Sequence, residues 1–251
     1  MNNLTKRVFL PFIFCALIFL TGCVRYEVGV NFHHQQGGEI TQHITLGQRL
    51  TALSETEANN WLNSIEERAR LLDGSAKRLS SQEMLVTIPF SNGEDLSKKF
   101  NQFFNPNATD KDPVTSSNNL EILQLQSDLQ VRQTNLLFLE RNKLNLQVDL
   151  RGLGILSNSG NIVVSPGSLV NIDFALTTPW GGKIIANEID GESSKVGNGL
   201  VWHLKPGEIN QLSAVFWTPS YLGIGTGIII LSAIFFYFVK YKQIPGAPIR
   251  Q

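Results

Sequence analysis

The chain has 251 residues, with 21 acidic and 21 basic side chains and no formal net charge. Segment 24–220 holds all 21 acidic residues but only 16 of the basic ones, and this excess of acid argues against nucleic acid as the main partner. The two cysteines, Cys15 and Cys23, both precede that segment. Disulfides, thiol nucleophiles and cysteine-ligated metals are therefore excluded from it.

The N-terminus has the pattern of a bacterial lipoprotein signal. Two basic residues precede the apolar run 8–20, which is short for a membrane span. The run ends in Leu20-Thr21-Gly22-Cys23, which fits the lipobox after which the lipoprotein signal peptidase cuts. We expect residues 1–22 to be removed and Cys23 to carry the lipid. The alternative is an uncleaved signal anchor in which Cys23 is an ordinary residue.

The first half of the mature chain alternates between strand and helix signals. Residues 24–32 and 39–46 read as the two strands of a hairpin around Gly37-Gly38. A capping box at Ser54 opens a helix whose apolar residues recur at steps of three and four until Asp73-Gly74. A strand over 83–90 and a second amphipathic helix over 92–104 follow.

From residue 105 on, the helical period disappears. Residues 105–119 are polar and rich in turn formers, so we expect a mobile loop there. The remaining candidate strands are 120–129, 134–140, 144–151, 161–164, 168–176, 183–190, 199–204 and 210–217. Together these elements predict one α+β domain, 23–220, with a mostly antiparallel sheet and two amphipathic helices packed on it.

Residues 221–239 predict a transmembrane helix. They carry no charge, and 19 residues at about 1.5 Å each nearly span a hydrocarbon core of about 30 Å. Lys240 and Lys242 follow, so residues 240–251 are expected to be cytoplasmic. The domain would then be exported and tethered by a lipid at one end and a helix at the other. Gly223 and Gly227 form a small-xxx-small pair that lets helices approach closely, although glycine is common in membrane helices.

Several motifs together carry a resemblance to a known family. They are Gly22-Cys23-Val24-Arg25-Tyr26, Arg141-Asn142-Lys143-Leu144, Asp149-Leu150-Arg151, Thr178-Pro179-Trp180-Gly181, Trp202-His203-Leu204-Lys205-Pro206-Gly207-Glu208-Ile209-Asn210 and Phe216-Trp217-Thr218-Pro219. With them the chain resembles membrane-anchored proteins of unknown function from cyanobacteria and chloroplasts, which are distantly similar to the mycobacterial lipoprotein LppM. The resemblance implies an α+β domain with an apolar cavity between sheet and helices, lipid as a candidate ligand, and a plasma or thylakoid membrane. It provides no catalytic residues.

Four side chains are candidate ligand or partner contacts. Trp180 and Trp202 offer large apolar faces with one donor each, although core packing is the alternative. Trp180 is the first choice, because it stands between a proline and two glycines in a predicted turn. Asp149 and Arg151 lie two apart on one strand and share a face, where they would orient a polar head group or simply pair with each other.

The sequence contains no nucleophile elbow, metalloprotease helix, phosphate loop or dinucleotide fingerprint. We therefore expect a non-enzymatic binding or assembly module on the periplasmic or lumenal face, without metal or cofactor, whose partner is a lipid or a membrane protein. Two alternatives remain open. One is a hydrolase or transferase acting on lipid or envelope polymer, and the other is a purely structural subunit docked through its transmembrane helix.

Overall fold

The structure is a computed structural model that describes residues 24–34, 37–47, 55–105, 126–151, 170–185 and 192–241, to which all structural statements refer. The predicted signal peptide 1–22, the lipid attachment site Cys23 and nearly all of the predicted loop 105–119 lie outside the described residues.

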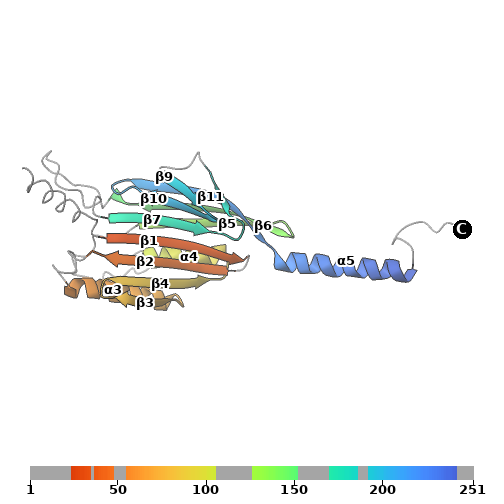
Figure 1. Cartoon of the computed structure of the whole chain (residues 1–251), viewed down its shortest axis with the longest axis horizontal. Coiled ribbons are helices and arrows are strands. Elements are labelled where there is room, and N and C mark those ends of the chain that lie inside the picture. Colours follow the sequence, from red (N-terminus) through yellow and green to blue (C-terminus); the bar gives the residue numbers. More distant parts are fainter. Residues whose placement is uncertain are drawn as a thin grey trace, which may run out of the picture.

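Two sheets and three helices make up the described part of the chain (Figure 1). Sheet A has the order β3-β4-β2-β1-β7-β10-β9 and sheet B the order β5-β6-β11-β8. Every pair is antiparallel except β1 with β7. The strands are β1 Val24–His34, β2 Gly37–Leu46, β3 Ser75–Ser80, β4 Glu83–Phe90, β5 Gln126–Asn135, β6 Leu139–Asp149, β7 Val170–Thr177, β8 Gly182–Ile184, β9 Glu192–Val196, β10 Gly199–Leu204 and β11 Ile209–Pro219. The helices are α3 Glu55–Leu71, α4 Gly93–Phe104 and α5 Tyr221–Tyr241.

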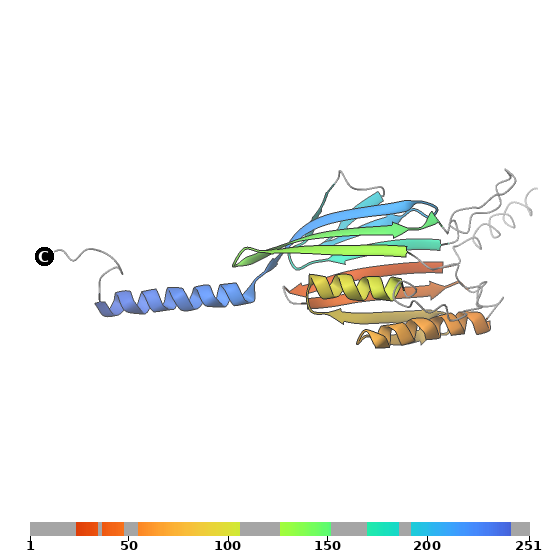
Figure 2. The ribbon, with the colours of Figure 1, turned by 180° about the vertical axis from the view of Figure 1, so that it is seen from behind.

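Sheet A forms one layer, and α3, α4 and sheet B lie together on one of its faces (Figure 2). Phe32 of β1 meets Phe216 of sheet B with ring centroids 4.7 Å apart, and Phe100 of α4 meets Phe174 of β7 at 6.4 Å. The inward side chains of both sheets and both helices therefore bury one continuous core. This is the α+β architecture with two packed amphipathic helices that the sequence predicts.

Helix α4 closes the edge of sheet B. The Asn101 side chain accepts a hydrogen bond from the backbone N–H of Leu129 (2.8 Å) and donates one to its carbonyl oxygen (3.0 Å). One turn earlier, the Ser97 hydroxyl accepts from the N–H of Val131 (3.1 Å). Four residues of helix advance about 6 Å and two residues of strand about 6.7 Å, so the two spacings match closely. The polar side of α4 thus hydrogen-bonds β5 much as another strand would, and blocks pairing at this edge.

The strand pattern of the second half was predicted less well than the helices. The predicted strand 134–140 is wrong, because residues 136–138 form the turn between β5 and β6, with Leu137 at φ 67°. Its apolar side chains gave no turn signal. Strands β3 and β9 were missed because they are edge strands whose side chains are mostly exposed and show no apolar alternation.

Helix α5 leaves the domain directly from the last strand. Ser220 is the one residue between β11 and α5, and α5 extends away from the sheets (Figure 1). Its 21 residues span about 31 Å at 1.5 Å each, and it is long and apolar enough to cross a membrane. The helix predicted over 221–239 is therefore confirmed, with its end two residues later.

The first described residue and α5 lie at opposite ends of the domain (Figure 1). Strand β1 runs parallel to β7, and Gly182, soon after β7, pairs with Phe216 near the end of β11. Both β1 and β7 therefore run toward the α5 end. The 11 residues of β1 are separated by ten rises of about 3.3 Å, so Val24 stands about 33 Å from that end.

Candidate functional site

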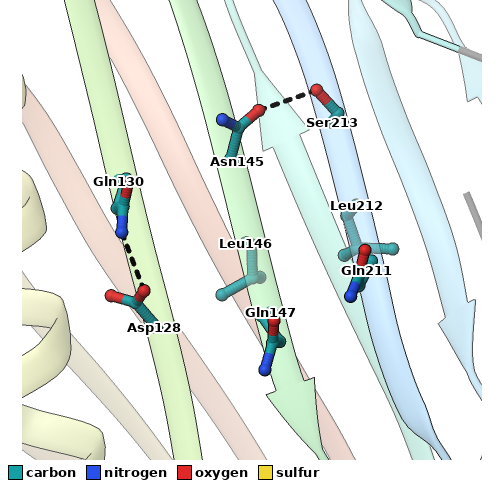
Figure 3. Close-up of a pocket in the computed structure, with 8 residues that line it drawn as sticks. All are labelled: Asp128, Gln130, Asn145, Leu146, Gln147, Gln211, Leu212 and Ser213. Atoms are coloured by element: carbon teal, nitrogen blue, oxygen red, sulfur yellow. Dashed lines mark hydrogen bonds between the residues drawn. The ribbon is translucent and has the colours of Figure 1, made fainter. Parts of the chain in front are cut away.

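The outward face of sheet B carries a shallow polar groove (Figure 3). Its volume is about 350 Å³, and it is lined by Asp128, Gln130, Asn145, Leu146, Gln147, Gln211, Leu212 and Ser213. The strand register places Gln130, Asn145 and Ser213 in one row across β5, β6 and β11, and Asp128, Gln147 and Gln211 in the next. The polar lining of the groove is therefore built by outward positions of three adjacent strands, while Leu146 and Leu212 belong to the buried core beneath it.

Amide and hydroxyl groups dominate the groove. The Ser213 hydroxyl donates to Asn145 Oδ1 at 2.8 Å, and Gln130 Nε2 donates to Asp128 Oδ2 at 2.9 Å. Because Ser213 bonds an amide oxygen rather than a base, this geometry does not activate it as a nucleophile. Amides supply donors and acceptors together, so the groove can hydrogen-bond a polar ligand or surface.

Toward α5 the same face becomes basic and aromatic. Arg132, Lys143 and Lys183 lie in one row across β5, β6 and β8, and Arg141 pairs with Trp217 in the row nearer α5. The Trp217 side chain is partly exposed. The outward face of sheet B is thus graded along its length, from polar amides to cations and an aromatic ring beside the helix.

The predicted pair Asp149 and Arg151 lies at the far end of this face. Arg151 Nη2 contacts Asp149 Oδ2 at 2.6 Å, and Arg151 Nε contacts Oδ1 at 3.0 Å. Hydrogen bonds from the guanidinium and the backbone N–H of Arg151 hold the pKa of Asp149 below its usual range. Both carboxylate oxygens are engaged, so a polar head group would have to displace Arg151 first.

The two candidate tryptophans lie in different environments. Trp202 is fully buried in β10, with its ring 5.8 Å from that of Phe174, so an external ligand reaches it only if the core opens. Trp180 is 57% exposed in the turn between β7 and β8, where Gly181 has a φ of 75°. This turn is at the α5 end of the domain. The structure therefore does not bring Trp180, Trp202 and the Asp149–Arg151 pair together.

A small apolar void lies between α4 and the two sheets in the part of the chain that the structure describes. An apolar void lined by Val28, Phe100 and Phe174, among others, measures about 20 Å³. A void of that size holds about one water molecule, and an acyl chain does not fit. This void is therefore too small to be the lipid cavity that the family resemblance implies.

Gly223 and Gly227 contact the β5–β6 hairpin of the same chain. A Cβ on Gly223 would overlap the carbonyl oxygen of Leu137, and one on Gly227 would lie 2.8 Å from the ring of Phe138. The two glycines thus permit a close approach, but the neighbour is the chain's own hairpin. A second helix could use this face only if the hairpin moved away. The sequence could not indicate this contact, because the hairpin tip had been assigned to a strand.

No group of three or more His, Cys, Asp or Glu side chains in the described ranges is arranged to hold a metal ion. His43 lies between Glu83 (Nε2 to Oε1, 2.7 Å) and Glu27 (Nδ1 to Oε2, 3.4 Å) on sheet A. His33 instead faces Glu39 nearer the β1–β2 turn, so these two histidines do not converge.

Fold and site together define a mixed α/β domain with a polar groove on one sheet face and a C-terminal apolar helix. Residues 30–241 match the family model described as "Protein of unknown function (DUF3153)", and the chain belongs to this family. The NMR structure of the folded domain of the Mycobacterium tuberculosis LppM protein is 10% identical, with 82% of this chain and 96% of that chain covered and a TM-score of 0.41. The predicted distant likeness to LppM is confirmed as a structural match. The comparison with curated proteins gave no match.

Proposed function

We propose that this protein is a non-enzymatic, membrane-anchored module that binds another membrane protein and supports its assembly. The domain would stand on the periplasmic or lumenal face of a plasma or thylakoid membrane. Helix α5 would cross that membrane, with Lys240 and Lys242 on the cytoplasmic side. The observation that carries the proposal is the direct passage of β11 into α5.

The β11–α5 junction holds the domain in one orientation. The N–H of Ser220 donates to the carbonyl oxygen of Phe138 at 2.8 Å, and the Ser220 hydroxyl accepts from the N–H of Gly223 at 3.3 Å. Without a flexible linker the domain cannot swing freely about its anchor. A fixed orientation favours lateral docking against a neighbouring protein over the capture of a diffusing substrate.

The groove on sheet B is the surface that we assign to this docking. The strands of sheet B continue in the general direction of α5, so their outward face would look sideways over the membrane (Figure 2). Its exposed amides suit a polar protein surface, whereas the apolar void beneath α4 is too small to take an acyl chain. Of the two ligand classes that the sequence left open, protein is therefore favoured.

The predicted lipid at Cys23 is hard to reconcile with a domain that stands upright on the membrane. Cys23 directly precedes Val24, which lies about 33 Å from the α5 end of sheet A. An acyl chain spans about one leaflet, half of the roughly 30 Å hydrocarbon core, so it cannot bridge this distance. Acyl chains on Cys23 could enter the membrane that holds α5 only if the domain lay on its side, so we assign the orienting role to α5.

Co-purification from mild detergent tests the proposal. We expect the full-length protein to retain a membrane-protein partner, and the double substitution Gln147→Arg with Gln211→Arg in the groove to lose most of it. The matched control, Leu85→Arg with Asn171→Arg, adds the same charge to the outward face of sheet A and should retain the partner.

Equal retention by the groove variant and the control would contradict docking through the groove, and a protein that never retains a partner would refute the assembly role. Turnover of a lipid or envelope polymer that is lost on substituting a single Ser, Asp or His would instead favour the hydrolase or transferase alternative.

A further inference from the structure

The tip of the β5–β6 hairpin is a cluster of large apolar side chains that are substantially exposed. Leu136, Leu137, Phe138 and Leu139 are 53%, 63%, 46% and 37% exposed. Hairpin turns are ordinarily polar, and a contiguous apolar patch marks a surface that meets an apolar partner. The position of the tip indicates which partner this is.

The tip lies against the first two turns of α5. The carbonyl oxygen of Leu137 packs against Gly223, and the ring of Phe138 packs against Gly227. Gly227 is six residues beyond Tyr221, where α5 begins, and this corresponds to about 9 Å along the helix axis. If α5 crosses the membrane from its first turn, Phe138 lies at a similar depth beside it.

Three backbone N–H groups of the tip have hydrogen-bond partners within the hairpin. The N–H of Leu136 donates to the carbonyl oxygen of Leu139 at 2.7 Å, and that of Phe138 to the carbonyl oxygen of Leu136 at 2.8 Å. The N–H of Leu137 donates to the Asn135 side chain at 3.0 Å. An unsatisfied backbone donor is costly in hydrocarbon, so the internal partners of these three N–H groups lower the cost of moving the tip out of water.

Side chains suited to the lipid head groups follow directly behind the tip. Arg141 and Trp217 form a cross-strand pair two residues from Leu139, and Arg132 and Lys183 lie in the next row. Tryptophan prefers the membrane interface, and long basic side chains reach toward lipid phosphates. From the tip toward the domain, apolar side chains are followed by an aromatic ring and then by cations. A lipid leaflet has the corresponding order of hydrocarbon, interface and phosphates.

We propose that the hairpin tip, Leu136 to Leu139, inserts into the hydrocarbon of the outer leaflet beside α5. Arg132, Arg141 and Lys183 then lie at the level of the lipid phosphates. The inference rests on the proposed function in one respect, namely that α5 crosses the membrane. It adds a second membrane-penetrating element, which makes the domain resist tilting about the α5 junction.

Nitroxide accessibility in the full-length protein tests this inference. Nitroxide-bearing non-natural residues at Leu137, at Ile229 in α5 and at Leu79 in β3 leave both cysteines untouched. The protein is placed in vesicles of phosphatidylcholine and phosphatidylglycerol, and relaxation by oxygen, which concentrates in hydrocarbon, is compared with relaxation by a water-soluble nickel complex. Leu79 is a matched exposed leucine, 48% accessible, remote from α5.

We expect relaxation by oxygen to exceed relaxation by the nickel complex at Leu137 and Ile229, and the reverse at Leu79. Nickel dominance at Leu137 with oxygen dominance at Ile229 would overturn the insertion and leave the anchoring by α5 intact. Shielding of Leu137 from both reagents would mean that a protein covers the tip, which also overturns the inference. Nickel dominance at Ile229 would refute the membrane anchor itself and the inference with it. A probe at Leu136 provides a second reading should the Leu137 variant fold poorly.

Discussion

At the scale of single residues, Gly223 is the position where a side chain is least tolerated. A Cβ there would collide with the backbone carbonyl of Leu137, which cannot rotate away as a side chain would. We expect Gly223→Ala to lower the free energy of unfolding in detergent by about 1–3 kcal/mol, as overpacking generally does. Thermal unfolding followed by circular dichroism measures this change.

The matched control is Gly225→Ala in the same helix. A Cβ at Gly225 meets nothing within 4 Å, so this substitution should be neutral or stabilise the helix by up to about 1 kcal/mol. Equal effects of the two substitutions would contradict the contact between α5 and the hairpin.

Asp149 makes the stability of the fold slightly dependent on pH in the acidic range. Because Arg151 holds the folded-state pKa of Asp149 below its unfolded value, this pair stabilises the fold above about pH 4. The contribution is lost as the pH falls from there through the lower folded-state pKa. We expect Arg151→Met to raise the pKa of Asp149 toward its ordinary value, as measured by carboxyl NMR titration. An unchanged titration midpoint would show that the ion pair does not form in solution.

At the scale of secondary-structure elements, the contact of α4 with β5 depends on a few polar side chains. The Asn105 side chain accepts a hydrogen bond from the N–H of Ser127 and donates one to its carbonyl oxygen. Asn101 makes the same two hydrogen bonds with Leu129, two residues later in β5. Replacing Asn101 with Leu leaves the N–H and C=O of Leu129 without partners, at a cost of roughly 1–3 kcal/mol for each buried group. Urea unfolding should show this loss.

Lys98→Leu is the control for this element, because Lys98 is exposed on the same helix. Its effect should stay within about 0.5 kcal/mol, as is usual at the surface. If Asn101→Leu were equally mild, the edge of sheet B would be held by other contacts.

The same elements show what the sequence could and could not predict. The period of 3.6 in α4 predicts its apolar face correctly, and Leu96, Phe100, Phe103 and Phe104 are all buried. The hairpin tip 136–139 has the composition of a strand, so local pattern alone could not distinguish it from one. The groove was missed because Asn145, Gln147 and Gln211 occupy ordinary outward positions, and only strand register assembles them.

At the scale of the whole molecule, the two predicted anchors make opposite demands. With α5 across a membrane as proposed, its contact with the hairpin tip would hold the domain end-on, with Val24 at the remote end. A lipid on Cys23 in the same bilayer would require the domain to lie flat. Both the proposed lateral docking through the groove and the proposed insertion of the tip require the domain to stand end-on, so this is the claim on which they depend.

The most direct test of this claim is the height of two probes above the bilayer. Fluorophores attached through non-natural residues at Val196, near the α5 end, and at Lys205, at the other end of β10, would transfer energy to acceptor lipids in proteoliposomes containing the full chain. We expect Lys205 to lie farther from the bilayer than Val196 by about 20 Å, the length of the six-residue strand β10. Equal heights would contradict the end-on arrangement.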